Sequence, residues 1–138
     1  MKVLPLLCSA FLGMAAFGAP AFADNPNEPA PRCFSMHDFQ SWKAPDARTI
    51  FIRVDINHYY RLDLAAPCQS LKMIDAHLIT KVRGSDQVCD GLDWDLSVAD
   101  SSGFGINGHR GFKQACIVKT QTPLSPAEVA QIPAKFKP

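Results

Sequence analysis

The chain has 138 residues and a formal net charge of +1, a length that allows one domain with a single buried core. Basic and acidic residues are balanced, 14 against 13, so composition argues against a nucleic-acid partner and against attachment to anionic lipid, both of which need a basic surplus. The acids are eleven Asp and only two Glu, and Asp is typical of turns and strand ends rather than helices. Composition therefore favours a strand-rich domain.

Residues 1–23 have the three parts of a cleavable secretory signal. Lys2 supplies a positive charge, Val3–Phe17 is apolar, and small residues stand at Ala21 and Ala23. We expect cleavage near Ala23, which leaves 115 residues of a periplasmic or secreted protein, with 13 basic and 13 acidic side chains because Lys2 is the only charge removed. A retained membrane anchor is the alternative. It would need about 20 apolar residues, so we expect no membrane span after cleavage.

The mature chain divides into a leader, one domain and a tail. Three prolines and no periodicity in residues 24–32 predict a flexible leader. Residues 33–132 carry the strand patterns and are expected to form a single β-rich domain. Residues 133–138 are expected to be a mobile basic tail.

Alternating apolar and polar side chains predict strands over residues 49–54 and 60–64. A three-residue loop at 56–58 would join them as a hairpin in a register that brings the two apolar faces together. The same register sets Arg53 opposite Arg61, an unfavourable pair of like charges.

The rest of the domain is expected to continue as short elements between turns. Residues 67–74 can form a turn or two of helix with Ile74 facing inward, and alternation predicts strands at Leu78–Val82, Leu92–Val98 and Gln114–Thr120. We therefore expect a mostly β fold, a small antiparallel barrel or sandwich of about five or six strands with a short C-terminal helix and two disulfides.

The C-terminal helix has the clearest local signal. Ser125 is a natural N-cap, Pro126 suits the first helical position, and Glu128 completes a capping box. Pro133 is expected to end the helix.

Four cysteines remain once Cys8 leaves with the signal, and an even number in an exported chain predicts two disulfides. Four cysteines allow three pairings, and the sequence alone does not choose among them. We favour Cys33–Cys116, which would tie the first core segment to the last, and Cys68–Cys89, which would close a short central loop. A zinc or redox site would normally need a close C-x-x-C pair, which the spacing does not provide.

Residues 103–108 match the pattern G-x-G-x-x-G. A dinucleotide site needs a helix directly after this pattern, whereas a strand pattern follows here, so we predict a glycine-rich loop and no cofactor. Apolar and basic side chains on this Gly103–Phe112 loop make it a candidate partner loop. Its candidate contact residues are Phe104, Ile106, His109, Arg110 and Phe112.

The remaining acidic and histidine residues give no catalytic or metal pattern. A calcium loop starting at Asp93 would want glycine where Val98 stands, so Asp93 and Asp95 are expected to be a solvated pair rather than a metal site. A glycosidase also uses two carboxyl groups, and Asp93 and Asp95 are a possible pair. The sequence gives no sign that either of them is buried, as the general acid of such a pair would be. The four histidines share no spacing and no G-x-S-x-G motif occurs, so we predict no catalytic residue and no metal.

Several short motifs nevertheless resemble a domain-of-unknown-function family of small exported proteobacterial proteins with four cysteines, over residues 33–130. They are Arg-Thr-Ile-Phe at 48–51, Tyr-Arg-Leu-x-Leu at 60–64, Pro-Cys-x-x-Leu at 67–71, Val-Cys-x-Gly at 88–91, Cys-Ile at 116–117 and Leu-Ser-Pro-Ala-Glu at 124–128. The resemblance implies a periplasmic or secreted bacterial protein with paired cysteines and brings no catalytic residues. Leu92 departs from the pattern, in which a charged residue commonly follows the glycine.

Three functions follow as hypotheses. The first is a non-catalytic binding or envelope-accessory module, because no nucleophile, acid–base pair or metal cluster stands out. The second is a secreted inhibitor of a hydrolase that acts through the Gly103–Phe112 loop. The third is an uncharacterised enzyme, which would need a concave pocket with convergent polar groups. We expect a monomer whose partner is a periplasmic or extracellular protein.

Overall fold

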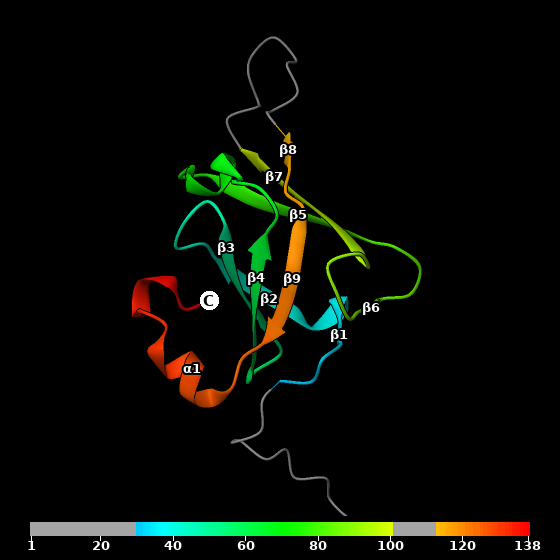
Figure 1. Cartoon of the computed structure of the whole chain (residues 1–138), viewed down its shortest axis with the longest axis vertical. Coiled ribbons are helices and arrows are strands. Elements are labelled where there is room, and N and C mark those ends of the chain that lie inside the picture. Colours follow the sequence, from blue (N-terminus) through cyan, green and yellow to red (C-terminus); the bar gives the residue numbers. More distant parts are fainter. Residues whose placement is uncertain (1–29, 101–112) are drawn as a thin grey trace, which may run out of the picture.

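The structure is a computed structural model that describes residues 30–100 and 113–138. Three antiparallel sheets form a sandwich-like, mostly β fold with one short α-helix in this part of the chain, as the sequence predicts (Figure 1). The barrel alternative is not realised, because the sheets do not close on one another. The described residues hold nine strands, several of them very short, where about five or six were expected.

One four-stranded sheet has the order β2-β3-β4-β9, and a three-stranded sheet has the order β5-β7-β8. The small third sheet pairs β1 with β6. The strands are β1 (Phe34–Ser35), β2 (Phe39–Lys43), β3 (Thr49–Val54), β4 (His58–Leu64), β5 (Ala76–Val82), β6 (Gln87–Val88), β7 (Trp94–Asp100), β8 (Lys113–Ala115) and β9 (Val118–Pro123).

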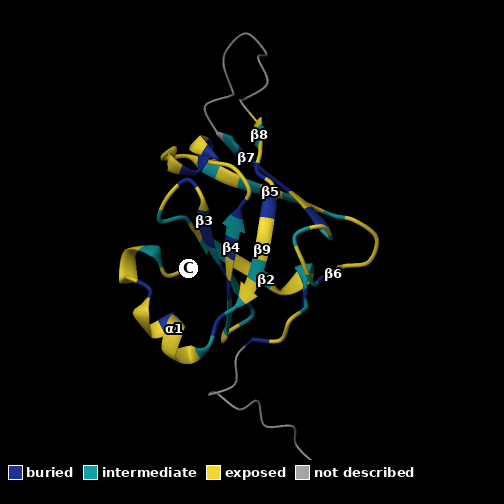
Figure 2. Ribbon diagram, viewed as in Figure 1, coloured by how far each residue is buried: buried dark blue, intermediate teal, exposed yellow. Residues whose placement is uncertain are grey.

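The main core lies between the inner faces of the sheets. Ile50, Ile52 and Tyr60 from the larger sheet pack in one cluster with Leu96 and Val98 from β7. Figure 2 shows these buried positions concentrated on the strands, while α1 is mostly exposed. Strand alternation places the apolar side chains on one face, and burying that face against a second sheet drives the folding of the domain.

The β3–β4 hairpin has the predicted faces but a different register. Its three-residue loop is 55–57 rather than 56–58, so Ile52 lies opposite Tyr60. Arg53 faces Tyr59, and the predicted contact between Arg53 and another arginine does not form. The register moves by two positions, which keeps every apolar side chain on the core face and removes the like-charge pair.

The disulfide pairing predicted from the sequence is wrong. The structure joins Cys33 to Cys89 and Cys68 to Cys116, and does not form Cys33–Cys116 or Cys68–Cys89. Cys33 directly precedes β1 and Cys89 directly follows β6, so the pairing of these two strands brings the two cysteines together. Each strand is only two residues long and leaves no periodic signal in the sequence.

The second disulfide follows from the pairing of β4 with β9. Leu64 lies opposite Val118, and Ala65 N–H donates to Ile117 O at 2.9 Å, so the chain after β4 runs beside Cys116. The bridges link residues 56 and 48 positions apart, and each would contribute about 4 kcal/mol by restricting the unfolded chain.

Two further elements differ from their sequence predictions. The predicted last strand is split, since β8 ends at Ala115 and β9 begins at Val118, and the chain passes from one sheet to the other between them. The 67–74 segment forms a 3-10 helix, η2 (Gln69–Lys72), that buries Leu71 but leaves Ile74 fully exposed rather than inward.

The helix α1 (Pro126–Gln131) has the predicted N-cap at Ser125 and a complete capping box with Glu128. It packs on the outer face of the larger sheet, where Leu124, Val129 and Ile132 form a second cluster with side chains that include Phe51. The predicted mobile tail contains a short 3-10 helix, η4 (Ala134–Phe136), which adds to this cluster.

The chain before Cys33 also contacts the body of the domain. Ala30 is buried, and the carbonyl of Pro31 accepts a hydrogen bond from the Tyr60 hydroxyl. The last residues of the predicted flexible leader therefore pack on the domain.

Gly91 stands where two chain segments approach closely. A Cβ atom at this position would lie 2.5 Å from the carbonyl oxygen of Val118. We predict that Gly91→Ala lowers the free energy of unfolding by about 1–3 kcal/mol, because backbone has to move to admit the methyl group. Urea denaturation measures the loss.

Gly84→Asn is the matched control for this substitution. Gly84 has a φ of +88° and no heavy atom within 4 Å of an added Cβ, and asparagine tolerates positive φ better than other side chains. Equal losses for the two variants would contradict the close-approach explanation.

Candidate functional site

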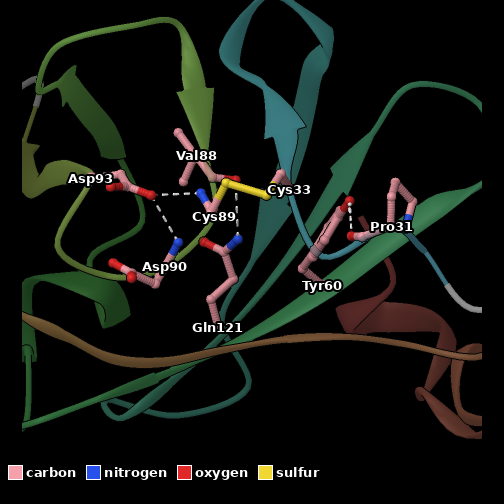
Figure 3. The surroundings of a disulfide bond; sticks show 8 residues. All are labelled: Pro31, Cys33, Tyr60, Val88, Cys89, Asp90, Asp93 and Gln121. Atoms are coloured by element: carbon pink, nitrogen blue, oxygen red, sulfur yellow. Dashed lines mark hydrogen bonds between the residues drawn. A yellow bond between two sulfur atoms is a disulfide. The ribbon is translucent and has the colours of Figure 1, made fainter.

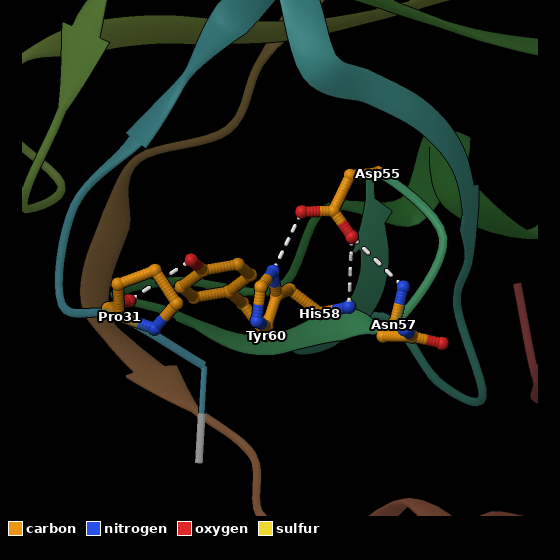
Figure 4. A network of polar contacts seen from close by, with 5 residues as sticks. All are labelled: Pro31, Asp55, Asn57, His58 and Tyr60. Carbon is orange, nitrogen blue, oxygen red and sulfur yellow. Dashed lines mark hydrogen bonds and ion pairs between the residues drawn. The ribbon is translucent and has the colours of Figure 1, made fainter. Parts of the chain in front are cut away.

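The polar cluster with the most enzyme-like geometry lies in the β3–β4 turn (Figure 4). His58 Nδ1 is 2.6 Å from Asp55 Oδ2. The other carboxylate oxygen, Oδ1, accepts hydrogen bonds from the backbone N–H groups of Asn57 at 2.8 Å and His58 at 3.2 Å. In nucleophilic catalysis, an aspartate orients a histidine, and the histidine activates a nearby hydroxyl or thiol. The neighbours of His58 therefore decide whether this pair can act in that way.

The surroundings assign this pair to the turn rather than to catalysis. Asp55 has a φ of 54°, and its side chain holds the two N–H groups that follow it, as turn aspartates commonly do. In the described part of the chain, no hydrogen bond joins His58 to a hydroxyl or thiol. Burial opposes ionisation of Asp55, but the hydrogen bonds from Asn57 and His58 outweigh it and lower the pKa of the carboxyl.

Tyr60 fills the core beneath this turn and has its own polar contact. Its side chain is fully buried, and its hydroxyl donates to the carbonyl of Pro31 at 2.9 Å. Burial, with a contribution from the negative charge of Asp55, raises the pKa of Tyr60 to about 12. The phenol therefore acts as a neutral hydrogen-bond donor that attaches the N-terminal segment to the sheet.

The Cys33–Cys89 bridge lies beside a loop that is held by aspartates (Figure 3). Asp93 Oδ2 accepts from the N–H groups of Cys89 at 2.7 Å and Asp90 at 3.0 Å. Asp90 Oδ1 in turn accepts from Leu92 N–H at 2.7 Å. Asp93, where the calcium pattern in the sequence begins, and Asp90 thus serve as acceptors for the loop backbone. No cluster of three or more side chains suited to a metal occurs among the described residues.

This loop shapes one wall of a groove of about 320 Å³, which we call the Leu92–Ile117 groove. The side of β7 from Trp94 to Ser97 forms its floor, and the chain between β8 and β9 forms the other wall. Leu92 is 76% exposed and Ile117 is 69% exposed, and both line the groove. Large aliphatic side chains that stay in water on the rim of a concavity are typical of binding surfaces.

An ion pair flanks the same groove. Arg83 contacts both oxygens of Asp95 through Nε and Nη2, and both residues line the groove. The hydrogen bond from Arg83 lowers the pKa of Asp95, and the same hydrogen bond raises that of Arg83. The groove thus combines two apolar rim residues with a fixed pair of opposite charges, a pattern suited to a ligand with both apolar and polar groups.

A disulfide and two backbone contacts hold the segments that line the groove. The Cys68–Cys116 disulfide anchors one wall, and Cys116 N–H also donates to Leu96 O at 2.9 Å. Gly91 touches the backbone of Val118 from the other wall. A ligand that binds here meets a preformed surface, which reduces the entropy lost on binding.

The sequence did not single out this groove. All five residues of the predicted partner loop, Phe104, Ile106, His109, Arg110 and Phe112, lie outside the described residues. The described residues on either side of it are Asp100, which ends β7, and Lys113, which begins β8. Ile117 carried a usable signal, because it is apolar at a position where alternation with buried Cys116 and Val118 predicts an outward side chain.

Comparisons with family models, with curated proteins and with solved structures find no match. Among the residues that the structure describes, no helix is long and apolar enough to cross a membrane.

The late ionisation of Tyr60 is a testable consequence of its burial. Because its pKa is raised in the folded state from 10.0 to about 12, the stability that it contributes is complete below pH 10.0 and is lost as pH rises through about 12. We expect phenolate absorbance to show a step near pH 12 that coincides with unfolding. Tyr60→Phe should lack this step, and its persistence in that variant would contradict the assignment.

The turn role of Asp55 is tested by two substitutions. Asp55→Ala removes the acceptors and places alanine at positive φ, so we expect the free energy of unfolding to fall by about 2 kcal/mol in urea denaturation. Asp55→Asn keeps an acceptor oxygen and tolerates this φ, and should lose clearly less.

The pH dependence of the Asp55 contribution has a defined sign. The pKa of Asp55 is lowered from 3.8 in the fold, so its contribution is present above pH 3.8 and is lost as pH falls through the lower folded value. The difference between the wild type and Asp55→Asn should therefore shrink in acid. A difference that grows in acid would contradict the role of the ionised carboxylate.

Proposed function

We propose that this chain is exported by residues 1–23, is cleaved near Ala23, and acts in the periplasm or outside the cell as a non-catalytic binding module. Its two disulfides fit an oxidising compartment. The resemblance to small exported proteobacterial proteins supports the same view of its location and stays a prediction.

The observation that carries the binding proposal is that Leu92 and Ile117, two exposed aliphatic side chains from different segments of the chain, line the same groove. Leaving two large aliphatic side chains in water forgoes roughly 1.5–3 kcal/mol of burial energy for each of them. Neither side chain belongs to the two core clusters, so folding of the described domain does not require them to be apolar. A partner that covers the groove would gain this burial energy on binding.

The charged residues of the groove suit recognition more than chemistry. Arg83 and Asp95 are bound to each other and are exposed to solvent. A catalytic acid or base has to reach a proton of the substrate, but here each charged group is bound to the other. A solvated ion pair can instead orient a docking partner and select for its charge.

We predict that the mature protein retains a specific periplasmic or extracellular protein in a pull-down, and that Leu92→Ser with Ile117→Ser abolishes this capture. Surface substitutions of this kind change stability by only about 0.5 kcal/mol, so the melting temperature should stay nearly constant. Mass spectrometry of the retained proteins measures the effect.

Ile56→Ser is the matched control. Ile56 is 78% exposed, similar to Leu92, but lies in the β3–β4 turn and does not line the groove. It should capture the same partner as the wild type. If the double variant still captures that partner, the groove is not the binding surface.

A further inference from the structure

A second groove, of about 340 Å³, is lined by residues of both larger sheets, which are not hydrogen-bonded to each other. We call it the β2–β5 groove. Trp42, Lys43 and Ala44 line it from the end of β2, Ala76 lines it from the start of β5, and Lys135 lines it from η4. It shares no lining residue with the Leu92–Ile117 groove.

Both strands that reach this groove are edge strands. β2 is the outer strand of the four-stranded sheet, and β5 is the outer strand of the three-stranded sheet. Consecutive residues of a strand point to opposite faces, yet Trp42 and Lys43 both line the groove. The groove therefore opens along the free edge of β2 rather than over one of its faces.

The register shows which backbone groups of β2 face this groove. Leu64 N–H donates to Arg48 O, so the even-numbered residues of β3 bond to β4 and its odd-numbered residues point to β2. Trp42 lies opposite Ile52, one of the even-numbered residues. The N–H and C=O of Trp42 are thus turned away from β3, towards the free edge, where an added strand can bind them.

β5 lines the groove through Ala76, at its start. Arg83 N–H donates to Asp93 O, which sets the alternation so that Leu78 turns its backbone N–H and C=O away from β7. Farther along, the Thr80 hydroxyl contacts the sulfur of Met36 at 3.8 Å. A ligand in the groove would therefore meet β5 at Ala76.

The charge of the groove has one sign. Lys43 and Lys135 line it, and no carboxylate does. Of the ion pairs formed within the described ranges 30–100 and 113–138, none includes either lysine. Asp75 is adjacent to the groove in sequence but does not line it. Lys135 Nζ lies over the Phe136 ring, 4.7 Å from its centroid, and a carboxylate can still bind either ammonium group.

Some of the apolar side chains that line the groove are exposed to solvent, and others pack in the core clusters. Ile74 is 102% exposed, which means that its whole side chain is in water, and it lines the groove together with Met73. Trp42 is only partly buried and packs against the main core. Phe136 packs with the second cluster on the outer face of the sheet. The inner side of the β2 edge is thus apolar, and its outer side carries Lys43.

We propose that the β2–β5 groove binds an extended acidic peptide segment of a partner protein, which adds to β2 as a further strand. Unpaired main-chain groups favour a peptide over a ligand without a backbone, because strand addition supplies a row of hydrogen bonds. Neighbouring side chains on one face of a sheet lie side by side. The bound segment therefore alternates, with apolar residues beside Trp42 and acidic residues beside Lys43. This recognition goes beyond the proposed function, since it uses a different surface.

An amide NMR titration of the full mature protein tests the proposal. The probe is a capped peptide of about six residues that alternates valine and glutamate, the length of an ordinary strand. We expect saturable shifts at the amides of Trp42 and Ala44. The valine–lysine counterpart, and a valine–glutamate peptide methylated on alternate backbone nitrogens, should bind much more weakly.

Lysine variants measure the contribution of charge. Lys43→Gln and Lys135→Gln should each weaken binding by about two- to fivefold, the range expected for one exposed charge contact. Lys119→Gln is the matched control, because this exposed lysine lies on β9 and outside the groove, and it should bind as the wild type does.

Several outcomes would overturn the proposal. They are equal binding of the valine–lysine or methylated peptide, no shift at Trp42 up to about 1 mM peptide, or binding of anionic phospholipid vesicles in place of the peptide. The Leu92→Ser, Ile117→Ser variant should titrate as the wild type does. If only that variant lost peptide binding, the peptide would bind at the Leu92–Ile117 groove and the β2–β5 proposal would be overturned. Failure of the pull-down, in contrast, leaves this titration unchanged, so the two proposals fail separately.

Discussion

The antiparallel pairing of β4 with β9 is the contact on which the rest of this structure depends. It places a strand from the end of the chain beside the central hairpin and turns the three-stranded β2-β3-β4 unit into a four-stranded sheet. It also runs the chain after Leu64 past Ile117, which brings Cys68 to Cys116. Beyond β9, Leu124 N–H donates to Tyr59 O, and α1 is then positioned to cover the outer face of the same sheet. Without this pairing, Cys68 would not be brought to Cys116. The helix and the segment around Ile117, which lines the Leu92–Ile117 groove, would not be held beside the larger sheet.

Because β8 and β9 belong to different sheets, the chain has to change direction between Ala115 and Val118. That change exposes Ile117 and leaves the edge of β7 near Trp94 without a strand partner on this side, and the resulting concavity is the Leu92–Ile117 groove. The β2–β5 groove has a related origin at the free edges of β2 and β5, where the two sheets approach without joining. Both candidate binding surfaces thus arise from the incomplete closure of a small sandwich. Open strand edges invite pairing with other chains, so proteins usually protect them or use them for recognition.

The polar side chains of the domain are mostly used to hold loops in place. Asp55 supports the β3–β4 turn, Asp90 and Asp93 support the loop after Cys89, and Ser125 with Glu128 begins α1. This use explains the surplus of aspartate over glutamate, because the short Asp side chain reaches nearby backbone N–H groups in turns. It also explains why the aspartates resemble a metal-binding pattern in the sequence, although no cluster of three or more side chains suited to a metal occurs among the described residues.

Features that depend on neighbouring residues could be predicted from the sequence. Alternation identified β3, β4, β5 and β7 because side chains two positions apart share a face, and the capping box identified α1 because its bonds span three residues. Tertiary structure alone decided the disulfide pairing, the hairpin register and the exposure of Leu92 and Ile74. Cys33 meets Cys89 through two-residue strands that have no period to detect, and Ile74 is exposed because η2 ends at Lys72 before a further turn can bury it. Contacts between segments far apart in the chain set these features, and a local pattern carries no information about which distant segment will be the neighbour.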